Sequence, residues 1–430
     1  MKSFSTGAVT RFYLPLMLQA FSQSLTYPLV AGVVTHGVHG VNALTAFSQG
    51  LMIMFMIGSL GGGLVTTGLV FAKTRFGYLS FRRLNAFMMV ALLALQCVPA
   101  LPPFDGWLFG GFFALPPELA VIARRMLLEG VVMNGAFFLR NVPMVVLFNH
   151  YESGKANNAT VVRILVTLGL STAFPALGLT GPDWGLAALT VGVFFEYFVT
   201  WLYARPYVER LGGPSSEVEL GHSLLELTLE QFRFTLPLAL GGFLLATSPL
   251  VIAAFVARSA NAVDMLAVHY VTIGVANPVA YGALRFQPVS VKFPPEYPGD
   301  RRLLGYAVVA GLILGLVPLA FATPWLGGLY FCGYQNLPAR LLPAARFAIG
   351  LYAVIAVIQA VRARIEGIAA ASRRPKAVMA GQIAYTASLL IACVAMLPTG
   401  VPGWLLAVTA ITAAPVCTAA TIYAALRLKP

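Results

Sequence analysis

Charged residues are scarce in this sequence. Asp, Glu, Lys and Arg make up 10% of its 430 residues, whereas hydrophobic residues make up 59%. A soluble domain carries about 25% charged residues, which keep its surface in contact with water. So few charges exclude a water-soluble protein of this length, and the composition indicates an integral membrane protein.

Cysteine is rare as well. The four cysteines lie far apart and form no CxxC pair, which excludes a zinc site or disulfide framework of the usual spacing. We expect them to pack as small hydrophobic side chains. They are Cys97, Cys332, Cys393 and Cys417.

Motifs of enzymatic chemistry are missing. The sequence has no G-x-x-x-x-G-K-[S/T] nucleotide site and no G-x-S-x-G nucleophile motif. His36 and His39 form an H-x-x-H pair without a third metal ligand. We therefore expect no enzymatic activity, no metal and no cofactor. Transport by such a chain would be driven by an ion gradient rather than by hydrolysis.

Long apolar runs dominate the sequence instead. A helix needs about 20 apolar residues to cross a bilayer core about 30 Å thick. The predicted fold class is therefore all-α, a polytopic membrane protein with about twelve spans. They lie at 9–35, 42–71, 84–102, 126–148, 160–178, 184–204, 233–257, 264–288, 303–323, 341–369, 377–397 and 403–425.

One polar segment interrupts these runs near the middle of the chain. It extends from Glu209 to Glu230 and contains the sequence Leu-Gly-Gly-Pro-Ser-Ser. The sequence thus predicts an N-terminal six-helix bundle at 1–208, a cytoplasmic linker at 209–230 and a C-terminal six-helix bundle at 231–430.

Basic residues are distributed unevenly between the predicted connections. Of the 28 Lys and Arg residues, 22 fall in alternate connections that include both termini, five fall in the others, and Arg140 lies inside a span. This count assigns Arg163 to the connection before the fifth span. Because basic residues favour the cytoplasmic side, we expect both termini in the cytoplasm of a multi-pass plasma (inner) membrane protein. The net charge of +13 then faces anionic membrane lipids, and no nucleic acid partner is expected.

The two predicted halves share a sequence motif. Residues 11–18 read R-F-x-L-P-L-x-L, and residues 233–240 read the same 222 positions later. This spacing is called the repeat offset below. The alternative is a chance likeness between two apolar helices that contain proline. A duplicated unit with an even number of spans gives parallel repeats, and transporters with repeats bind substrate near the membrane midplane.

Arginines inside the predicted spans follow the same spacing. Arg140 and Arg362 are separated by the repeat offset in the fourth and tenth spans, and so are Arg124 and Arg346 near the outer ends of these spans. Guanidinium groups bind carboxylates and phosphates. We expect Arg140 and Arg362 to face each other across a central cavity as a site for an anion. Alternatively, Arg362 reaches the cytoplasmic headgroups and an acid of the protein neutralises Arg140.

Two acids are candidates for ion coupling. Glu196 lies in the sixth span at about the depth of Arg140, where it could pair with that arginine or carry a proton. Glu129 lies about three helical turns before Arg140, although a surface ion pair with Arg125 is an alternative role.

Uncharged polar residues complete the predicted substrate site. Asn134 precedes Arg140 in the fourth span, and Gln19 and Gln23 form a polar patch in the first span. These side chains either line the cavity or bond a neighbouring helix.

Short motifs along most of the chain carry a family resemblance. They are Gly68-Leu69-Val70-Phe71, Leu236-Pro237-Leu238-Ala239-Leu240, Pro249-Leu250-Val251, Phe255-Val256-Ala257-Arg258, Ala280-Tyr281-Gly282, and Arg364 followed by Gly367 and Arg373-Arg374. The sequence resembles the multidrug/oligosaccharidyl-lipid/polysaccharide (MOP) exporter superfamily, and within it the progressive ankylosis branch. The resemblance implies a V-shaped pair of helical bundles that works by alternating access.

The resemblance also directs the functional expectation. Members of the ankylosis branch are associated with export of anionic metabolites, whereas other branches move lipid-linked sugars, or drugs in exchange for protons or sodium. The first span lacks the aspartate of some multidrug members. We therefore expect a monomeric secondary exporter of an anionic solute, such as a polycarboxylate or a phosphate-bearing metabolite, coupled to protons or sodium. Alternatives are a flippase for a lipid-linked oligosaccharide or polysaccharide precursor, a proton- or sodium-coupled multidrug exporter, a membrane-embedded lipid transferase, and a non-transporting scaffold or receptor.

Overall fold

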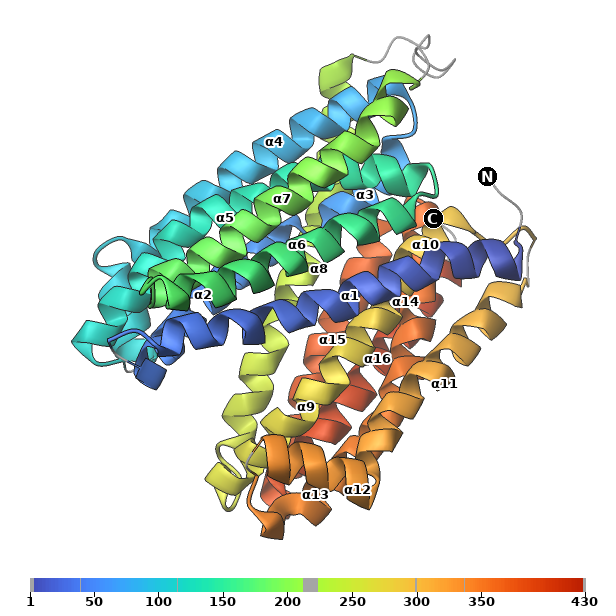
Figure 1. The fold of residues 1–430 in the computed structure, drawn as a ribbon. Coiled ribbons are helices and arrows are strands. Elements are labelled where there is room, and N and C mark those ends of the chain that lie inside the picture. Colours follow the sequence, from blue (N-terminus) through green and yellow to red (C-terminus); the bar gives the residue numbers. More distant parts are fainter. Residues whose placement is uncertain are drawn as a thin grey trace. The chain divides into compact units, whose positions relative to one another are not determined.

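The computed structural model describes residues 4–38, 40–113, 115–211, 223–297, 300–335 and 337–427. The side chains at positions 22–28, 41, 263 and 334 lie outside this description. The described residues form helices and no strand (Figure 1). The predicted all-α fold class is confirmed.

The described residues of the first half form seven α-helices. They are α1 (Thr6–Thr35), α2 (Gly40–Gly58), α3 (Gly63–Phe71), α4 (Arg75–Cys97), α5 (Pro117–Asn149), α6 (Ser153–Ala176) and α7 (Pro182–Glu209). Three short elements join them, the 3-10 turns η1 (Ser59–Gly61) and η2 (Val98–Ala100) and the π-helix η3 (Gly106–Phe112).

In the second half, the described residues form nine α-helices. They are α8 (Leu224–Val256), α9 (Ala262–Leu284), α10 (Phe286–Lys292), α11 (Arg302–Ala322), α12 (Pro324–Gly327), α13 (Leu342–Leu351), α14 (Ile355–Ala371), α15 (Pro375–Met396) and α16 (Gly403–Arg427). The short elements are the π-helix η4 (Gly328–Tyr334) and the 3-10 turns η5 (Ala339–Leu341), η6 (Tyr352–Val354) and η7 (Leu397–Thr399).

Ten helical stretches in the described part of the chain are long and apolar enough to cross a membrane. They coincide with ten of the predicted spans, and the other two predicted spans coincide with α1 and with α9–α10. The protein is thus an integral membrane protein with multiple spans. Of the predicted linker at 209–230, residues 212–222 lie outside the described residues.

Several helices begin earlier than the apolar runs predict. The helix α4 starts nine residues before the predicted span because the Thr74 hydroxyl accepts a hydrogen bond from the Gly77 amide at 3.1 Å and caps the first turn. Pro117, Pro182 and Pro375 are the first residues of α5, α7 and α15. Proline is favoured there because its fixed φ suits a helix and its missing N–H is not needed.

The duplication predicted from the sequence is confirmed in the helices themselves. The span Pro117–Asn149 and the span Ala339–Ala371 have equal length and are separated by the repeat offset. The π-helices η3 and η4 are related by the same offset, and so are the starts of α6 and α15. The offset seen in the first sequence motif therefore continues through both halves.

Contacts between Cα atoms divide the chain into two units. One contains residues 22–239, and the other contains residues 1–21 together with 240–430. The boundaries fall inside α1 and α8. These units are defined by contacts in space, whereas the predicted domains at 1–208, 209–230 and 231–430 are defined by the sequence repeat. The predicted domains stay a prediction. Residues 6–21 and 224–239 are called the exchanged segments below, because each packs with elements of the other half of the sequence.

The exchanged segment of α1 is anchored by aromatic and polar side chains. The ring of Phe12 packs edge-on against Phe293 at a centroid distance of 6.1 Å. The Tyr13 hydroxyl donates to the Gly282 carbonyl at 3.1 Å. Both contacts fix the first half of α1 on the α9–α10 region.

The exchanged segment of α8 repeats this arrangement. Phe234 packs edge-on against Phe71 at 5.3 Å, and the hydroxyls of Thr235 and Thr67 share a hydrogen bond of 2.7 Å. Phe234 follows Phe12 by the repeat offset, and Phe293 follows Phe71 by the same offset. The repeated Arg-Phe pair of the sequence motif thus marks an aromatic anchor that occurs once in each unit.

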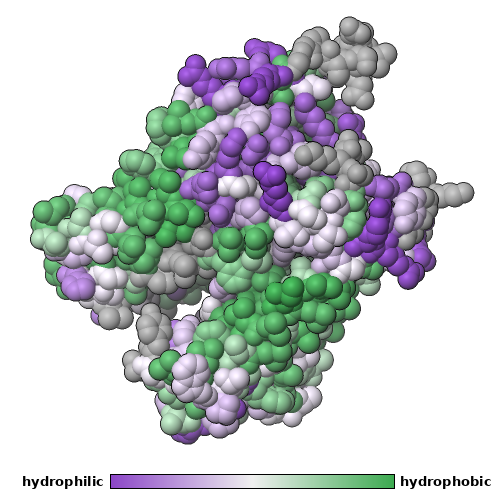
Figure 2. Space-filling view, turned by 45° about the vertical axis from the view of Figure 1, so that its right-hand side comes forward, coloured by the Kyte–Doolittle hydropathy of each residue, from purple (hydrophilic) through white to green (hydrophobic). Residues whose placement is uncertain are grey.

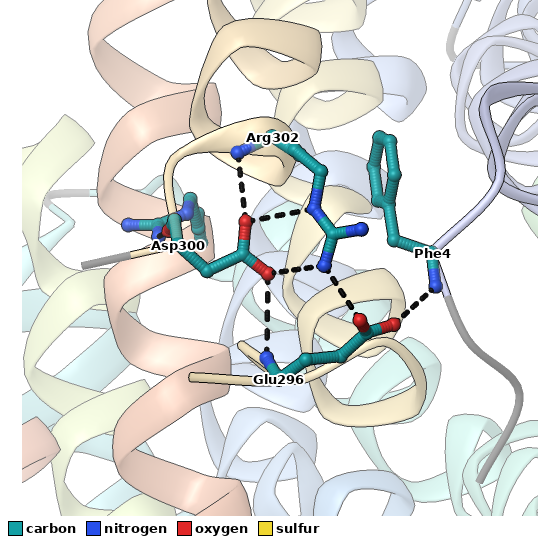
Figure 3. Close-up of polar contacts among 5 residues, drawn as sticks. Phe4, Glu296, Asp300 and Arg302 are labelled. Atoms are coloured by element: carbon teal, nitrogen blue, oxygen red, sulfur yellow. Dashed lines mark hydrogen bonds and ion pairs between the residues drawn. The ribbon is translucent and has the colours of Figure 1, made fainter. Parts of the chain in front are cut away.

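A polar cluster holds the start of the chain (Figure 3). The Arg302 guanidinium donates to both carboxylate oxygens of Asp300, at 3.0 and 2.9 Å, and to Glu296 at 2.7 Å. The other Glu296 oxygen accepts the Phe4 amide at 2.8 Å, and the Arg302 guanidinium lies over the Phe4 ring at 5.3 Å. These contacts tie residues before α1 to the connection between α10 and α11.

Large hydrophobic side chains lie on the surface as well as inside. Figure 2 shows extended hydrophobic areas on the visible face. Phe87, Val90, Leu165, Leu312 and Ile313 are each more than half exposed. This is the surface expected of helices that face lipid rather than water.

Candidate functional site

The predicted pair of Arg140 and Glu196 is present. The α5 and α7 helices pack together and bring an Arg140 guanidinium nitrogen to 2.7 Å from Glu196 Oε2. The Glu196 side chain is fully buried, whereas 12% of the Arg140 side chain is exposed. The Thr160 hydroxyl of α6 donates to Glu196 Oε1 at 2.5 Å. A buried carboxylate is stable only when charges and donors surround it in this way.

A second arginine binds the same carboxylate. The Arg163 guanidinium of α6 lies 3.1 Å from Glu196 Oε2, and its side chain is 4% exposed. Assigning Arg163 to a connection was wrong, because α6 begins at Ser153 and carries Arg163 almost three turns into the bundle. The polar run 153–158 has the composition of a loop, but it forms the first turns of α6. Two guanidiniums thus share one acid, and the cluster has a formal charge of +1.

Arg362 occupies a different kind of network in the second half. Its Nε donates to Glu366 at 2.8 Å, and its two terminal nitrogens donate to Gln359 at 3.3 Å and Gln382 at 2.9 Å. The guanidinium also lies 5.0 Å from the centroid of the Tyr385 ring. With 2% of Arg362 exposed and one acid for one arginine, the network is buried and electrically balanced.

The two networks occupy equivalent places in the repeat, but their acids, Glu196 and Glu366, come from positions that the repeat offset does not relate. In the first half the acid comes from α7, while in the second half it comes from the turn of α14 that follows Arg362. The repeat offset relates residues of one network to positions in the other half. The related pairs are Thr160 and Gln382, Arg163 and Tyr385, Glu196 and Thr418, and Met144 and Glu366. The duplicated scaffold thus holds one positively charged cluster and one neutral one.

Comparison with known proteins identifies the fold. No family model matches the sequence, and no curated protein matches it either. Among solved structures, a MOP-superfamily transporter from Pyrococcus furiosus matches with a TM-score of 0.70 at 15% identity, over 100% of both chains. Its report describes a binding pocket of reversed polarity and suggests a different function for that protein. The chain has the fold of the MOP-superfamily transporters.

Other solved structures agree with this assignment. A multidrug-resistance MATE transporter in an outward-facing conformation matches with a TM-score of 0.68 at 18% identity, over 98% of this chain and 96% of the other. A mutant of the MATE transporter VcmN from Vibrio cholerae matches with a TM-score of 0.70 at 12% identity, over 98% and 97%. The predicted resemblance to the MOP superfamily is confirmed for the fold, while the ankylosis branch stays a prediction.

Within this MOP fold, the outer arginines have local partners. Arg124 lies 3.0 Å from Asp105, and the Nε of Arg346 donates to the Ala322 carbonyl at 2.9 Å. The hydrogen bond from Arg124 lowers the pKa of the Asp105 carboxyl, which lies between two spans. These contacts do not test substrate binding, so the predicted substrate role of Arg124 and Arg346 stays a prediction.

The acid Glu129 forms the surface pair that was its alternative role. Its carboxylate lies 2.7 Å from Arg125, four residues earlier in α5, and 39% of its side chain is exposed. Arg125 also lies 3.0 Å from Asp183 at the start of α7. The predicted coupling role of Glu129 remains without a test.

The uncharged candidates are buried where they are described. Asn134 donates to Gln96 at 2.8 Å and is 3% exposed, and Gln19 is 1% exposed in α1. The side chain of Gln23 lies outside the described residues. The substrate roles of Asn134, Gln19 and Gln23 stay predictions.

Metal-binding groups are sparse in the MOP fold of this chain. The described residues contain no group of three His, Cys, Asp or Glu side chains that could hold a metal ion. The Nδ1 of His36 contacts the Gly32 carbonyl at 2.6 Å, and His39 lies outside the described residues. All four cysteines are free thiols.

Proposed function

We propose that the protein is a secondary active transporter that exports an anionic solute by alternating access. The substrate class is a polycarboxylate or a phosphate-bearing metabolite. The observation that supports this most strongly is the sharing of the buried Glu196 carboxylate by two guanidiniums, those of Arg140 and Arg163. The MOP-type fold supports the transport part of the proposal.

The chemistry of the cluster suits a substrate that replaces the protein acid. The Nε of Arg140 is buried without a hydrogen-bond partner among the described residues, while part of the side chain is exposed. An incoming carboxylate or phosphate would bind the Arg140 fork, and Arg163 would keep Glu196 neutralised. Glu196 is then also the proposed coupling residue, because loss of one cationic partner changes its affinity for a proton or sodium.

Arg362 is proposed as the anion-binding arginine of the second half. Its ligands Gln359, Gln382 and Glu366 are the groups that a substrate would have to displace. Because this network is charge-balanced, we expect it to bind the anion more weakly than the Arg140 cluster.

Efflux from proteoliposomes tests the proposal. Vesicles are loaded with citrate, ATP or pyrophosphate under an imposed proton or sodium gradient, and export is compared for the wild type, Arg140→Gln and Arg163→Gln. The matched control is Arg125→Gln, an arginine of the same helix α5 whose ion pair is exposed. We expect export of at least one anion, loss of it in Arg140→Gln, and unchanged export in the control.

Further substrates in the same assay decide between the alternatives. Movement of a polyprenyl-diphosphate sugar without export of soluble anions would favour the flippase, and export of a cationic dye would favour the multidrug exporter. Chemical turnover of a lipid by the purified protein would favour the transferase. Wild-type vesicles that move none of these compounds would contradict a transport function.

A further inference from the structure

A pocket of about 380 Å³ opens on the unit of residues 22–239, between α4, α5 and α7. It is separate from the ion cluster in its lining, which includes neither Arg140 nor Arg163 nor Glu196. Figure 1 shows the three helices lying along one another. The pocket therefore runs along the helices of a bundle rather than across them.

The charged lining lies at one end of this pocket. Arg82 is seven residues from the start of α4, about 10 Å along the helix, while Glu209 ends α7 and Arg205 lies about one turn before it. This is the helix end that the distribution of basic residues predicts to be cytoplasmic. A ligand with its charge at this end would sit at the depth of the lipid headgroups.

Aromatic and apolar residues make up the remaining lining of the pocket. Tyr78 and Trp201 lie near the charged end, whereas Met89 is about 21 Å from the start of α4 and Leu139 about 15 Å from the end of α5. Half of a bilayer core is about 15 Å thick. The pocket thus changes from a charged and aromatic end to an apolar end over the depth of one leaflet.

The charges of the lining leave one cation uncompensated. Arg205 pairs with Glu209 at 3.0 Å, while the ion pairs found among the described residues include none with Arg82. The Arg82 guanidinium lies beside the Tyr78 hydroxyl instead. One free positive charge matches the single negative charge of a phosphodiester.

We propose that this pocket binds one anionic phospholipid of the cytoplasmic leaflet. The phosphate lies between Arg82 and Arg205 beside Tyr78, Trp201 flanks the glycerol region, and an acyl chain follows the apolar wall toward Met89. A soluble phosphate ester would satisfy the arginines but not the apolar wall. The site does not depend on the transport function proposed above.

Native mass spectrometry of the detergent-purified protein tests the site. Phosphatidylglycerol, phosphatidylcholine with the same acyl chains, and glycerol 3-phosphate are titrated separately. We expect Arg82→Gln and Arg205→Gln each to weaken phosphatidylglycerol binding about fivefold, the usual contribution of one basic residue at an anionic membrane surface. Phosphatidylcholine carries the same phosphate together with a compensating choline cation, so its binding should be weaker and should change less in both variants.

Arg83→Gln is the matched control, because Arg83 is exposed, adjacent to Arg82 and outside the pocket lining. An equal loss in Arg83→Gln would show a general surface-charge effect and overturn the proposal. Glycerol 3-phosphate that competes as well as the lipid would overturn the assignment to a lipid.

Tryptophan fluorescence provides a second measurement. Phosphatidylglycerol with brominated acyl chains quenches nearby indoles, so the wild type should lose more signal than Trp201→Phe at equal lipid concentration. Equal fractional quenching in the two proteins would place the bound lipid elsewhere and contradict the site.

Discussion

Arg163 lies 3.1 Å from Glu196 Oε2, the same oxygen that Arg140 approaches to 2.7 Å. Each arginine thereby provides the buried acid with a partner when the other is engaged elsewhere. Conversely, both arginines depend on one carboxylate. Because the cluster has two guanidiniums and one carboxylate, we expect it to respond differently to the loss of an arginine and to the loss of the acid.

Replacing Glu196 should be the most damaging single change in the cluster. Glu196→Gln removes the carboxylate that two buried guanidiniums share, and breaking a buried ion pair from one side costs about 3–5 kcal/mol. Arg163→Gln should cost clearly less, because Arg140 still neutralises the carboxylate. Thermal unfolding of the purified variants measures the order. A larger loss in Arg163→Gln than in Glu196→Gln would contradict the sharing of the acid.

The aromatic anchors of the exchanged segments should matter equally in both halves. Phe12→Ala and Phe234→Ala each remove a buried ring, at a cost of about 3–5 kcal/mol in a packed core. Leu14→Ala and Leu236→Ala are matched controls, because these leucines are 46% and 42% exposed in the same turns. Melting temperatures should fall for both phenylalanine variants and stay nearly constant for both leucine variants. A loss confined to one half would contradict equivalent anchoring.

Gly192 should prove necessary for the position of Arg163. A Cβ at Gly192 in α7 would collide with the Thr167 hydroxyl and lie 3.2 Å from the Arg163 side chain. Gly192→Ala should therefore reduce anion export and cost about 1–3 kcal/mol of stability, as overpacking does. Gly169→Ala in α6 is the control, since nothing lies within 4 Å of its Cβ. Unchanged export in Gly192→Ala would show that the cluster tolerates displacement of Arg163.

The polar cluster at the start of the chain should lose its effect in acid. Hydrogen bonds from Arg302 lower the pKa of Glu296 and of Asp300 below their ordinary values of 4.5 and 3.8. A lowered pKa contributes stability above the ordinary value, and that contribution is lost as the pH falls through the lowered one. The wild type should thus melt higher than Glu296→Gln at pH 7, and this difference should shrink as the pH falls below the ordinary carboxyl pKa of 4.5. A difference that stays constant as the pH falls from 7 until the protein unfolds would contradict the role of the ionised carboxylates.

The sequence predicted the scaffold well because its signals are local or periodic. Apolar runs locate the spans, and the repeat offset relates Arg140 to Arg362 whether or not they touch. It also predicted the Arg140–Glu196 pair, because two oppositely charged side chains at similar depth in an apolar bundle are stabilised by pairing with each other.

Other features depend on packing that no local pattern carries. Arg163 lies near the start of the predicted fifth span and was counted with the basic residues of the preceding connection, because polar helix ends and loops share a composition. Only the packing of α6 on α7 shows it to be buried. The acid beside Arg362 is Glu366, whose i,i+4 spacing could have been recognised in the sequence. The exchanged segments arise from contacts between residues more than 160 positions apart, such as Phe71 with Phe234.

Arg362→Lys should separate substrate binding from structure in the second half. Lysine keeps the charge but loses the planar fork that bonds Gln359, Gln382 and Glu366 together. If Arg362 binds the anion, the KM for export should rise at least about tenfold, the effect of losing about 1.4 kcal/mol. Gln359→Ala is the control for the network, because it removes one hydrogen bond and keeps the guanidinium. A lower melting temperature with an unchanged KM in Arg362→Lys would assign this arginine to the architecture of α14 and α15 and leave the Arg140 cluster as the anion site.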